Sequence, residues 1–404
     1  MRRHAGFSRA IRLATILVAS LGIAACGRLV PEPNASAGAP PVQQATQATS
    51  LRFDLHAGPA VGDLHLLEAD AGTALLSFRE SCPKLVQRTN GSGLTQPQDW
   101  ASACQAAETW PAGQAAAFFE TVFEAAQVGD GRAFATGYFE PEIEGARTHL
   151  PGYDTPVYAM PPDLVRARPG DASVLDDGEP PLGRYDEAGR FVPYYDRTEI
   201  ENGALAGRGL ELAWVRDPVE FFFLQVQGSG RLRLPDGEIM RIGYAGQNGL
   251  PYTGIGGVLN AYGLIGDAPG QYPGSMQGIM SYIREHPVEG AALMRQNRSW
   301  VFFREVQGDG PIGALGVPVR AQSSIAADPA FVPLGAPVWL DLDRSEADGL
   351  WIAQDTGGAI KGANRFDTFW GSGDEARLIA GGMSGRGRAL ILLPKGTLAR
   401  LGVR

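Results

Sequence analysis

The chain has 404 residues and a net charge of −9 at pH 7, with 44% hydrophobic and 20% charged residues. This composition is typical of a globular protein with an apolar core, and the length predicts two domains. A nucleic-acid partner is not expected, because phosphate binding depends on clustered Lys and Arg. No such cluster follows the first 25 residues.

Residues 1–25 are predicted to be a signal peptide. Four arginines accompany an uncharged apolar run over residues 13–24. This run is shorter than the roughly 20 apolar residues that a membrane-spanning helix needs, but it suits a signal peptide. Its removal takes away four arginines and no acidic residue, so the net charge of the mature chain becomes −13.

Small residues precede Cys26 directly. This arrangement resembles the lipobox of bacterial lipoproteins, which implies cleavage before Cys26 and acylation of that cysteine. By analogy, Gly27 favours attachment to the periplasmic face of the outer membrane. An ordinary secreted protein is the alternative. Residues 26–50 are rich in Pro, Ala, Gln, Ser and Thr, and we expect a disordered tether there.

The body of the chain begins with helical patterns and continues with strands. Apolar spacing predicts helices over residues 71–88 and 114–128. A strand is predicted over 134–143, loops and short strands over 151–193, and a buried strand over the apolar run 221–227. A hairpin of residues 231–234 and 238–244 is predicted around Asp236 and Gly237. Helices are expected over 275–285 and 287–296. Strands are expected over 300–306, 323–327, 337–342, 350–354 and 388–393, and this series suggests a barrel.

Two cysteines remain in the body, Cys82 and Cys104. In an exported protein, such a pair predicts a disulfide, because the compartment is oxidising. Two buried free thiols are the alternative.

Several common catalytic motifs are missing from the sequence. The five histidines and three cysteines show no metal-ligand spacing, and no Gly-x-Ser-x-Gly motif occurs. The stretch from Gly357 to Lys361 lacks the glycine spacing of a phosphate-binding loop. We therefore expect no metal and no organic cofactor, which leaves carboxylate chemistry.

The stretch over residues 353–371 places Asp355, Lys361 and Asp367 among glycines. Three aromatic residues adjoin the second aspartate: Phe366, Phe369 and Trp370. An acid packed against aromatic carbon loses hydration, so its pKa rises, as proton donation near neutral pH requires. A solvated Asp in a turn and aromatic residues of the core are the alternatives.

Four segments together carry a family resemblance: Thr136 to Pro141, Leu224 to Gly230, Ile242 to Tyr252, and the region with Asp328, Asp355 and Asp367. In this order they resemble the membrane-bound lytic murein transglycosylase A family over most of residues 130–395. The resemblance implies a mainly β fold with flanking α-helices, in which a smaller β-barrel-like domain is inserted into a double-psi β-barrel main domain. The expected main domain comprises residues 51–141 and 263–404, with a three-aspartate (3D) region at about 318–395, and the expected insert comprises 142–262.

By motif position, the resemblance implies that Asp367 is the catalytic acid and base, with Asp355 and Asp328 as supporting aspartates. The residues implied to contact substrate in a groove between the domains are Thr136, Gly137, Tyr138, Gln227, Gly228, Ser229 and Lys361. Lys361 is one of only three lysines, and we hypothesise that it binds sugar or acyl oxygens. An exposed lysine at a turn is the alternative.

The implied reaction cleaves the β-1,4 bond between N-acetylmuramic acid and N-acetylglucosamine and leaves a 1,6-anhydro end. One carboxyl group suffices, because the nucleophile is the muramic acid C6 hydroxyl and gains from intramolecular attack. Two alternatives stay open: a hydrolase in which Asp355 or Glu375 activates water, and an inactive glycan-binding lipoprotein. The expected partners are peptidoglycan strands and a lipid bilayer, and the expected state is a monomer.

Overall fold

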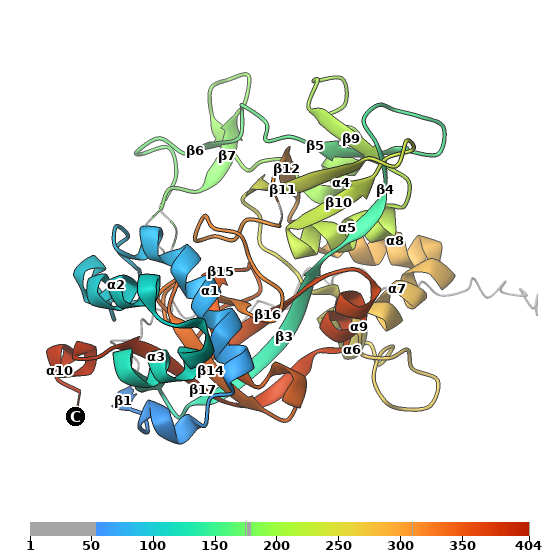
Figure 1. Ribbon diagram of the computed structural model, residues 1–404. Helices are drawn as coiled ribbons and strands as arrows, with labels where there is room; N and C mark the ends of the chain where they lie inside the picture. The colour runs from blue at the N-terminus through green and yellow to red at the C-terminus, as the bar shows by residue number, and fades with distance from the viewer. Residues whose placement is uncertain (1–53, 174, 176–178, 309, 404) are drawn as a thin grey trace, which may run out of the picture. The chain divides into compact units, whose positions relative to one another are not determined.

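The computed structural model describes residues 54–403 except 174, 176–178 and 309 (Figure 1). The predicted signal peptide, Cys26 and the predicted tether lie outside the described residues. In the part of the chain that is described, none of the helices has the length and apolar character that crossing a membrane requires.

The first sheet has eight strands. They are β1 (Leu55–Ala57), β2 (Phe123–Val128), β3 (Arg132–Glu140), β13 (Ser324–Ala327), β14 (Pro337–Leu342), β15 (Gly349–Asp355), β16 (Arg365–Ser372) and β17 (Ser384–Pro394). Their order is β1-β2-β17-β14-β15-β13-β16-β3, and β3 also pairs with β17. The strands from β17 to β3 therefore form a closed ring, which removes unpaired edges. Two pairs in this ring, β13 with β15 and β16 with β3, are parallel.

The second sheet has six strands in the order β12-β11-β10-β4-β9-β5. They are β4 (Glu142–Ala146), β5 (Thr155–Tyr158), β9 (Glu211–Val215), β10 (Ser229–Arg233), β11 (Ile239–Gln247) and β12 (Val301–Glu305). A small third sheet contains β6 (Val165–Arg166), β7 (Leu182–Tyr185) and β8 (Phe191–Val192). β12 follows residue 262 in the chain but pairs with β11, so this sheet extends past the expected end of the insert. The domain boundaries stay a prediction.

The predicted strand over residues 134–143 is divided between two sheets. β3 ends at Glu140 and β4 begins at Glu142, because Pro141 has no N–H to donate to a strand ladder. The predicted hairpin is confirmed as β10 paired with β11. Its turn uses Gly237 at φ 88°, a conformation that glycine adopts without strain. The strands predicted over 300–306, 323–327, 337–342, 350–354 and 388–393 are also confirmed.

The helices flank these sheets. They are α1 (Glu68–Leu85), α2 (Ala101–Thr109), α3 (Ala115–Val122), α4 (Arg197–Glu201), α5 (Pro218–Gln227), α6 (Ile255–Ala261), α7 (Met276–Glu285), α8 (Pro287–Gln296), α9 (Asp374–Gly382) and α10 (Thr397–Leu401). The predictions for α1, α7 and α8 are confirmed within a few residues. Helix α9 packs on β3 and β16 (Figure 1). The chain thus combines mixed sheets with helices.

The prediction of a buried strand over residues 221–227 is wrong, because this segment belongs to helix α5. Asp217 caps the helix by accepting hydrogen bonds from Val219 N and Glu220 N, and Pro218 occupies the first turn. Gly228 ends the helix at φ 80°. A short apolar run does not distinguish a strand from a helix that is buried on several sides.

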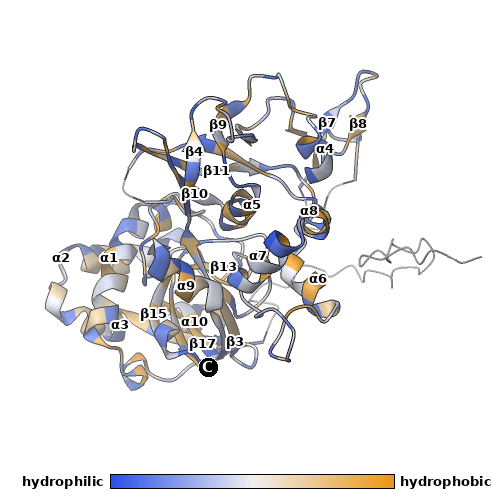
Figure 2. Cartoon of the chain, turned by 90° about the vertical axis from the view of Figure 1, so that its right-hand side faces the viewer, coloured by the Kyte–Doolittle hydropathy of each residue, from blue (hydrophilic) through white to orange (hydrophobic). Residues whose placement is uncertain are grey.

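Helix α5 is buried on two sides. Phe221 and Leu224 pack with the second sheet, whereas Phe222 and Phe223 pack with residues of α6, α7 and α8. Figure 2 shows α5 between the strands β10 and β11 and the helices α7 and α8. This double burial explains why four apolar residues follow one another from Phe221 to Leu224.

The helix predicted over residues 114–128 is also only partly correct. Helix α3 ends at Val122, and residues from Phe123 to Val128 form β2. β2 pairs with β1 and β17, so tertiary pairing overrides the helical spacing of the apolar residues.

Helix α1 is fastened to its surroundings by covalent and polar contacts. The predicted disulfide is confirmed, and it joins Cys82 of α1 to Cys104 of α2. On another face of α1, the buried side chain of Gln354 donates to Ser77 O and Ser81 Oγ, both at 3.0 Å. Because Gln354 directly precedes Asp355 in β15, these contacts fix the end of that strand.

Replacing both Cys82 and Cys104 by Ser is expected to lower the free energy of unfolding by about 3 kcal/mol. The disulfide closes a loop with a sequence separation of 22, and its loss returns conformational entropy to the unfolded chain. Urea denaturation of the variant and of the wild type measures the difference. Wild type in excess reductant is the control and should match the variant. Equal midpoints for the oxidised wild type and the variant would contradict the prediction.

Candidate active site

Four neighbouring strands of the first sheet bring the predicted catalytic residues into one row. Ala326 of β13 pairs with Asp355 of β15 on one side and with Asp367 of β16 on the other. Asp367 pairs in turn with Thr136 of β3. Residues paired across strands share one face of a sheet. One strand, β13, lies between the backbones of Asp355 and Asp367. Neighbouring strands in a sheet are about 4.8 Å apart.

The carboxyl group of Asp367 is bound by Thr136. The Thr136 hydroxyl donates to Asp367 Oδ1 at 2.6 Å. Burial raises the pKa of Asp367 to about 6, although the hydrogen bond from Thr136 and the positive charge of Arg365 oppose this rise. The charge of Asp355 adds to the rise. The predicted direction of the pKa shift is therefore confirmed, with desolvation as its main cause.

Asp355 uses both carboxylate oxygens for contacts within the protein. Its Oδ1 accepts from Ala314 N and Thr356 N, both at 2.9 Å, and its Oδ2 accepts from the Tyr138 hydroxyl at 3.2 Å. Burial raises the pKa of Asp355 to about 6 against the effect of these hydrogen bonds. Two neighbouring carboxyl groups of similar pKa titrate as a coupled pair.

Asp328 accepts hydrogen bonds from backbone N–H groups, one of which lies in the turn that carries Lys361. It lies directly after β13 and is buried. Its Oδ1 accepts from Ala330 N at 3.0 Å, and its Oδ2 accepts from Gly362 N at 2.8 Å. The carboxylate therefore ties the turn between β15 and β16 to the end of β13. Lys361 itself is exposed in this turn.

The three aromatic residues near Asp367 do not form one group. Phe366 and Trp370 belong to the main core, on the opposite face of β16 from Asp367. Phe369 lies on the same face as Asp367 and packs against Tyr138, with ring centroids 4.9 Å apart. The expectation that all three surround the acid is wrong for Phe366 and Trp370, because side chains alternate between the two faces of a strand.

Gly137 leaves room for the helix that covers the sheet. A Cβ atom at this position would lie 2.8 Å from Ala380 Cα and 2.9 Å from Trp370 Nε1. Its missing side chain therefore allows close packing of α9 and β3. Thr136 and Tyr138, on either side of it, contact the partly buried carboxyl groups of Asp367 and Asp355.

Gln227, Gly228 and Ser229 lie where α5 meets β10. Gln227 Oε1 accepts a hydrogen bond from Phe139 N at 3.0 Å, which links this junction to the strand that carries Thr136. Gly228 has φ 80° and forms the helix end. Within the described residues, Gln227 Nε2 has no hydrogen-bond acceptor and remains a donor for a ligand.

The sequence predictions missed two residues near Asp367, Arg365 and Tyr252. Arg365 donates from Nη2 to Thr136 Oγ1 at 2.9 Å. Its position two residues before Asp367 in a strand was the signal, because such residues share a face. Tyr252 ends one of the four quoted segments. Loss of hydration and the charge of Asp367 both raise its pKa.

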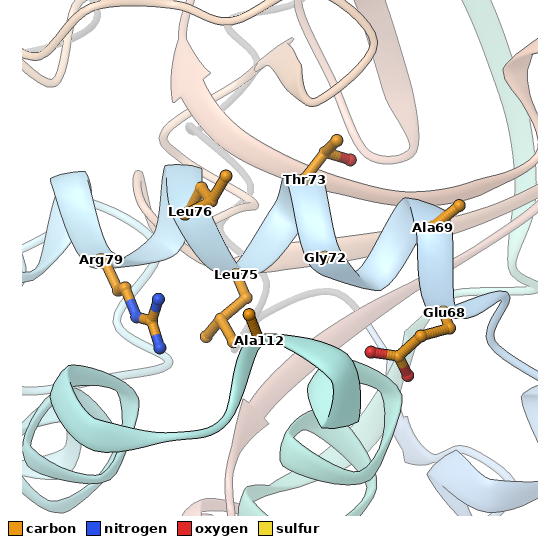
Figure 3. Close-up of a pocket in the computed structure, with 8 residues that line it drawn as sticks. All are labelled: Glu68, Ala69, Gly72, Thr73, Leu75, Leu76, Arg79 and Ala112. Carbon is orange, nitrogen blue, oxygen red and sulfur yellow. The ribbon is translucent and has the colours of Figure 1, made fainter.

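A hollow elsewhere on the molecule, along α1, has no functional features. Figure 3 shows its lining, which includes Glu68 and Arg79. Glu68 accepts from Ala115 N and Ala116 N, and Arg79 donates to the carbonyl groups of residues 107 and 110. Both charged groups are thus occupied in holding neighbouring helices. Among the described residues, no group of three His, Cys, Asp or Glu side chains could hold a metal ion.

Two family models match the chain. The MltA specific insert domain matches residues 134–304, and the 3D domain matches residues 323–393. Together the two matches cover the elements that carry the aspartate row and the α5–β10 junction.

Individual proteins show the same similarity. Membrane-bound lytic murein transglycosylase A of Vibrio cholerae is 30% identical over 273 residues, which cover 64% of this chain and 66% of that protein, slightly less than two thirds of its length. The crystal structure of membrane-bound lytic murein transglycosylase from Agrobacterium tumefaciens is 31% identical with a TM-score of 0.73, and the match covers 86% of this chain and 100% of that chain. Escherichia coli MltA with bound chitohexaose is 27% identical with a TM-score of 0.56, over 81% of this chain and 89% of that chain.

Replacing Asp367 by Asn is expected to stabilise the fold at neutral pH. The folded-state pKa of about 6 lies above the ordinary value of 3.8, so folding binds a proton between these values and stability falls as pH rises through this window. Above it, the charge on this partly buried carboxylate costs on the order of 3 kcal/mol. The Asn variant should therefore be more stable than wild type at about pH 7, with the difference vanishing below about pH 4.

Urea denaturation at several pH values measures this effect. Asp267→Asn, which changes an exposed carboxylate, is the matched control and should follow the wild type. A variant at position 367 with the pH dependence of the wild type would contradict the prediction.

Proposed function

The chain belongs to the membrane-bound lytic murein transglycosylase A family, and from this premise we propose that it cleaves the β-1,4 bond between N-acetylmuramic acid and N-acetylglucosamine in peptidoglycan, leaving a 1,6-anhydro end. The observation that carries the proposal is the partly buried carboxyl group of Asp367, which accepts from Thr136 and whose pKa of about 6 leaves part of the population protonated near neutral pH. The chitohexaose bound by the E. coli relative supports a glycan as the substrate class.

In the proposed mechanism, Asp367 acts twice. The protonated carboxyl group donates its proton to the glycosidic oxygen, which leaves with N-acetylglucosamine. The C6 hydroxyl of the muramic acid residue attacks the anomeric carbon and passes its proton to the Asp367 carboxylate, so the acid is restored and no water is consumed. The intramolecular nucleophile supplies a high effective concentration.

The contacts of Asp355 favour this reaction over hydrolysis. A base that activates water needs a free acceptor directed at that water. Asp355 Oδ1 already accepts two backbone N–H groups, and its Oδ2 accepts from Tyr138. Glu375 lies at the exposed start of α9, without a contact to Asp367 among those of the described residues. We propose that Asp355 tunes Asp367 by its charge and that Asp328 shapes the Lys361 turn.

Glycan contacts are proposed for the seven residues implied by the motifs. Gln227 Nε2 and exposed Lys361 supply hydrogen-bond donors for sugar or acyl oxygens. Ser229 supplies a hydroxyl group beside Gln227. Thr136, Gly137 and Tyr138 contribute chiefly by shaping the strand next to Asp367, as their contacts to Asp367, α9 and Asp355 indicate.

We further propose the domain organisation, the membrane attachment and the partner that go with this activity. The closed ring of six strands is the proposed double-psi barrel, in a main domain of residues 51–141 and 263–404, and the proposed insert at 142–262 contributes five of the six strands of the second sheet. Acylation at Cys26 would hold a monomer at the periplasmic face of the outer membrane, and the relatives named as membrane-bound support membrane attachment. Peptidoglycan strands are the proposed partner.

The purified mature protein is expected to release muropeptides with 1,6-anhydro ends from sacculi. Asp367→Asn should reduce this release by at least about 100-fold, because the variant has no proton to donate. Mass spectrometry identifies the products, since an anhydro end is lighter than a reducing end by one water molecule. Asp267→Asn is the control for a general effect of removing a carboxylate. Reducing ends would indicate a hydrolase, and binding without release would indicate an inactive glycan-binding protein.

Lys361→Arg is expected to lower turnover severalfold with little change in stability. A planar guanidinium cannot reproduce the compact ammonium group and its three donors, whereas an exposed side chain contributes little to the fold. Rates of muropeptide release and urea midpoints measure the two effects. Lys395→Arg tests the same replacement outside the proposed groove, at a lysine that donates to Glu120 O. Unchanged turnover in Lys361→Arg would remove Lys361 from the site.

A further inference from the structure

The side chain of Arg365 is positioned to control the hydroxyl group of Thr136. Its guanidinium lies over the ring of Phe134, 4.8 Å from the centroid, and also donates to Phe366 O. These contacts hold the guanidinium while Nη2 donates to Thr136 Oγ1 at 2.9 Å. Arg365 is therefore a fixed donor on one side of Thr136, and Asp367 lies on the other side.

A hydroxyl group has one proton to donate, and a guanidinium cannot accept a hydrogen bond. Because Thr136 Oγ1 accepts from Arg365, its own proton is directed to Asp367 Oδ1, 2.6 Å away. An oxygen that accepts such a bond is disfavoured as the site of the acid proton, which then belongs on Oδ2. Within the described residues, Asp367 Oδ2 has no hydrogen-bond partner, so it is free to face a substrate.

We propose that Arg365 is a positioning residue that acts through Thr136 to place the transferable proton of Asp367 on Oδ2. The inference rests on the proposed function, because only a reaction that begins with proton donation needs this proton in a defined place. The arrangement adds a role for Arg365, and it gives Thr136 a part in orienting the acid besides any contact with glycan.

The chain offers a matched control for Arg365. Arg386 stacks on the same ring of Phe134, with its guanidinium 4.7 Å from the centroid, and it lies on β17, which pairs with β3. Its contacts within the described residues do not include Thr136 or Asp367. Arg365→Gln and Arg386→Gln therefore each remove one cation from the same aromatic ring, but only the first breaks the relay.

The kinetic test compares Arg365→Gln, Thr136→Val, the double variant and Arg386→Gln in muropeptide release. Arg365→Gln is expected to lower kcat on the order of tenfold, part of what a positioned acid contributes, with KM little changed. Thr136→Val should lower kcat as well, and Thr136→Ser should restore it. In the Thr136→Val background, the Arg365 replacement should have a much smaller effect, because only the direct influence of its charge on Asp367 then remains. Arg386→Gln should match wild type.

A second test needs no substrate. Carboxyl ¹³C titration of aspartate-labelled protein, with Asp367→Asn to identify the signal, follows Asp367 directly. Loss of either Arg365 or the Thr136 hydroxyl removes an interaction that lowers the pKa of Asp367, so both variants should titrate at higher pH, whereas Arg386→Gln should not. The alkaline limb of kcat/KM should shift in the same direction, because the reaction requires the protonated acid.

The two tests separate the relay from the proposed function. A titration that is unchanged by Arg365→Gln overturns the relay whatever the reaction. So does a kinetic effect of Arg365→Gln that persists in full when Thr136 is Val, or an equal effect of Arg386→Gln. If wild type releases no anhydro product while the titration shift caused by Arg365→Gln is larger with Thr136 present than in the Thr136→Val background, the proposed function fails and the hydrogen-bond relay stands. Urea midpoints of each variant confirm that folding is retained.

Discussion

The pairing of β13 with both of its neighbours at Ala326 is the constraint on which the site depends. The register between β13 and β15 shifts at this point, from Ile325 opposite Ala353 to Ala326 opposite Asp355. The extra residue in β15 is Gln354. A one-residue change of register exchanges the faces of a strand. This irregularity places Asp355 in the row with Asp367, whereas the side chain of Gln354 is buried against α1. The contacts between Gln354 and α1 thus hold the irregularity in place.

The pKa values of Asp355 and Asp367 are raised because both carboxyl groups lose hydration and, among the described residues, neither forms a direct ion pair. Asp355 and Asp367 both have a pKa near 6 because desolvation exceeds the hydrogen bonds that they accept. Arg365 is close enough to lower the pKa of Asp367 but makes its hydrogen bond to Thr136. A direct ion pair would hold Asp367 ionised. Placing one hydroxyl group between the cation and the acid orients the carboxyl group and still leaves it able to carry a proton at neutral pH.

The sequence identified site residues that belong to motifs in a specific order. It did not predict secondary structure or side-chain orientation where these depend on packing between distant segments. Asp367, Asp355 and Thr136 were identified from motifs, and the structure brings them into one row. The apolar run before Gly228 was misread because a helix buried between a sheet and other helices lacks the periodicity of a surface helix. Phe366 and Trp370 were expected beside the acid because they are close in sequence, but strand alternation turns them into the core. The contact between Arg365 and Thr136 joins two distant segments, so no local pattern reveals it.

Strand β3 connects these features, because it carries Thr136 and then leads into the second sheet. Three residues after Thr136, Phe139 N donates to Gln227 at the α5–β10 junction. The next residue, Glu140, is buried and pairs with Arg241 of β11 at 3.0 Å. These contacts link the end of β3 to α5 and to β11 of the second sheet. A strand is stiff along its length, since its ladder bonds are shared with two neighbours, here β16 and β17. β3 therefore connects the α5–β10 junction to Thr136, whose hydroxyl group donates to the acid. The proposed glycan contact at Gln227 and the proposed proton transfer at Asp367 are therefore linked by one continuous piece of backbone.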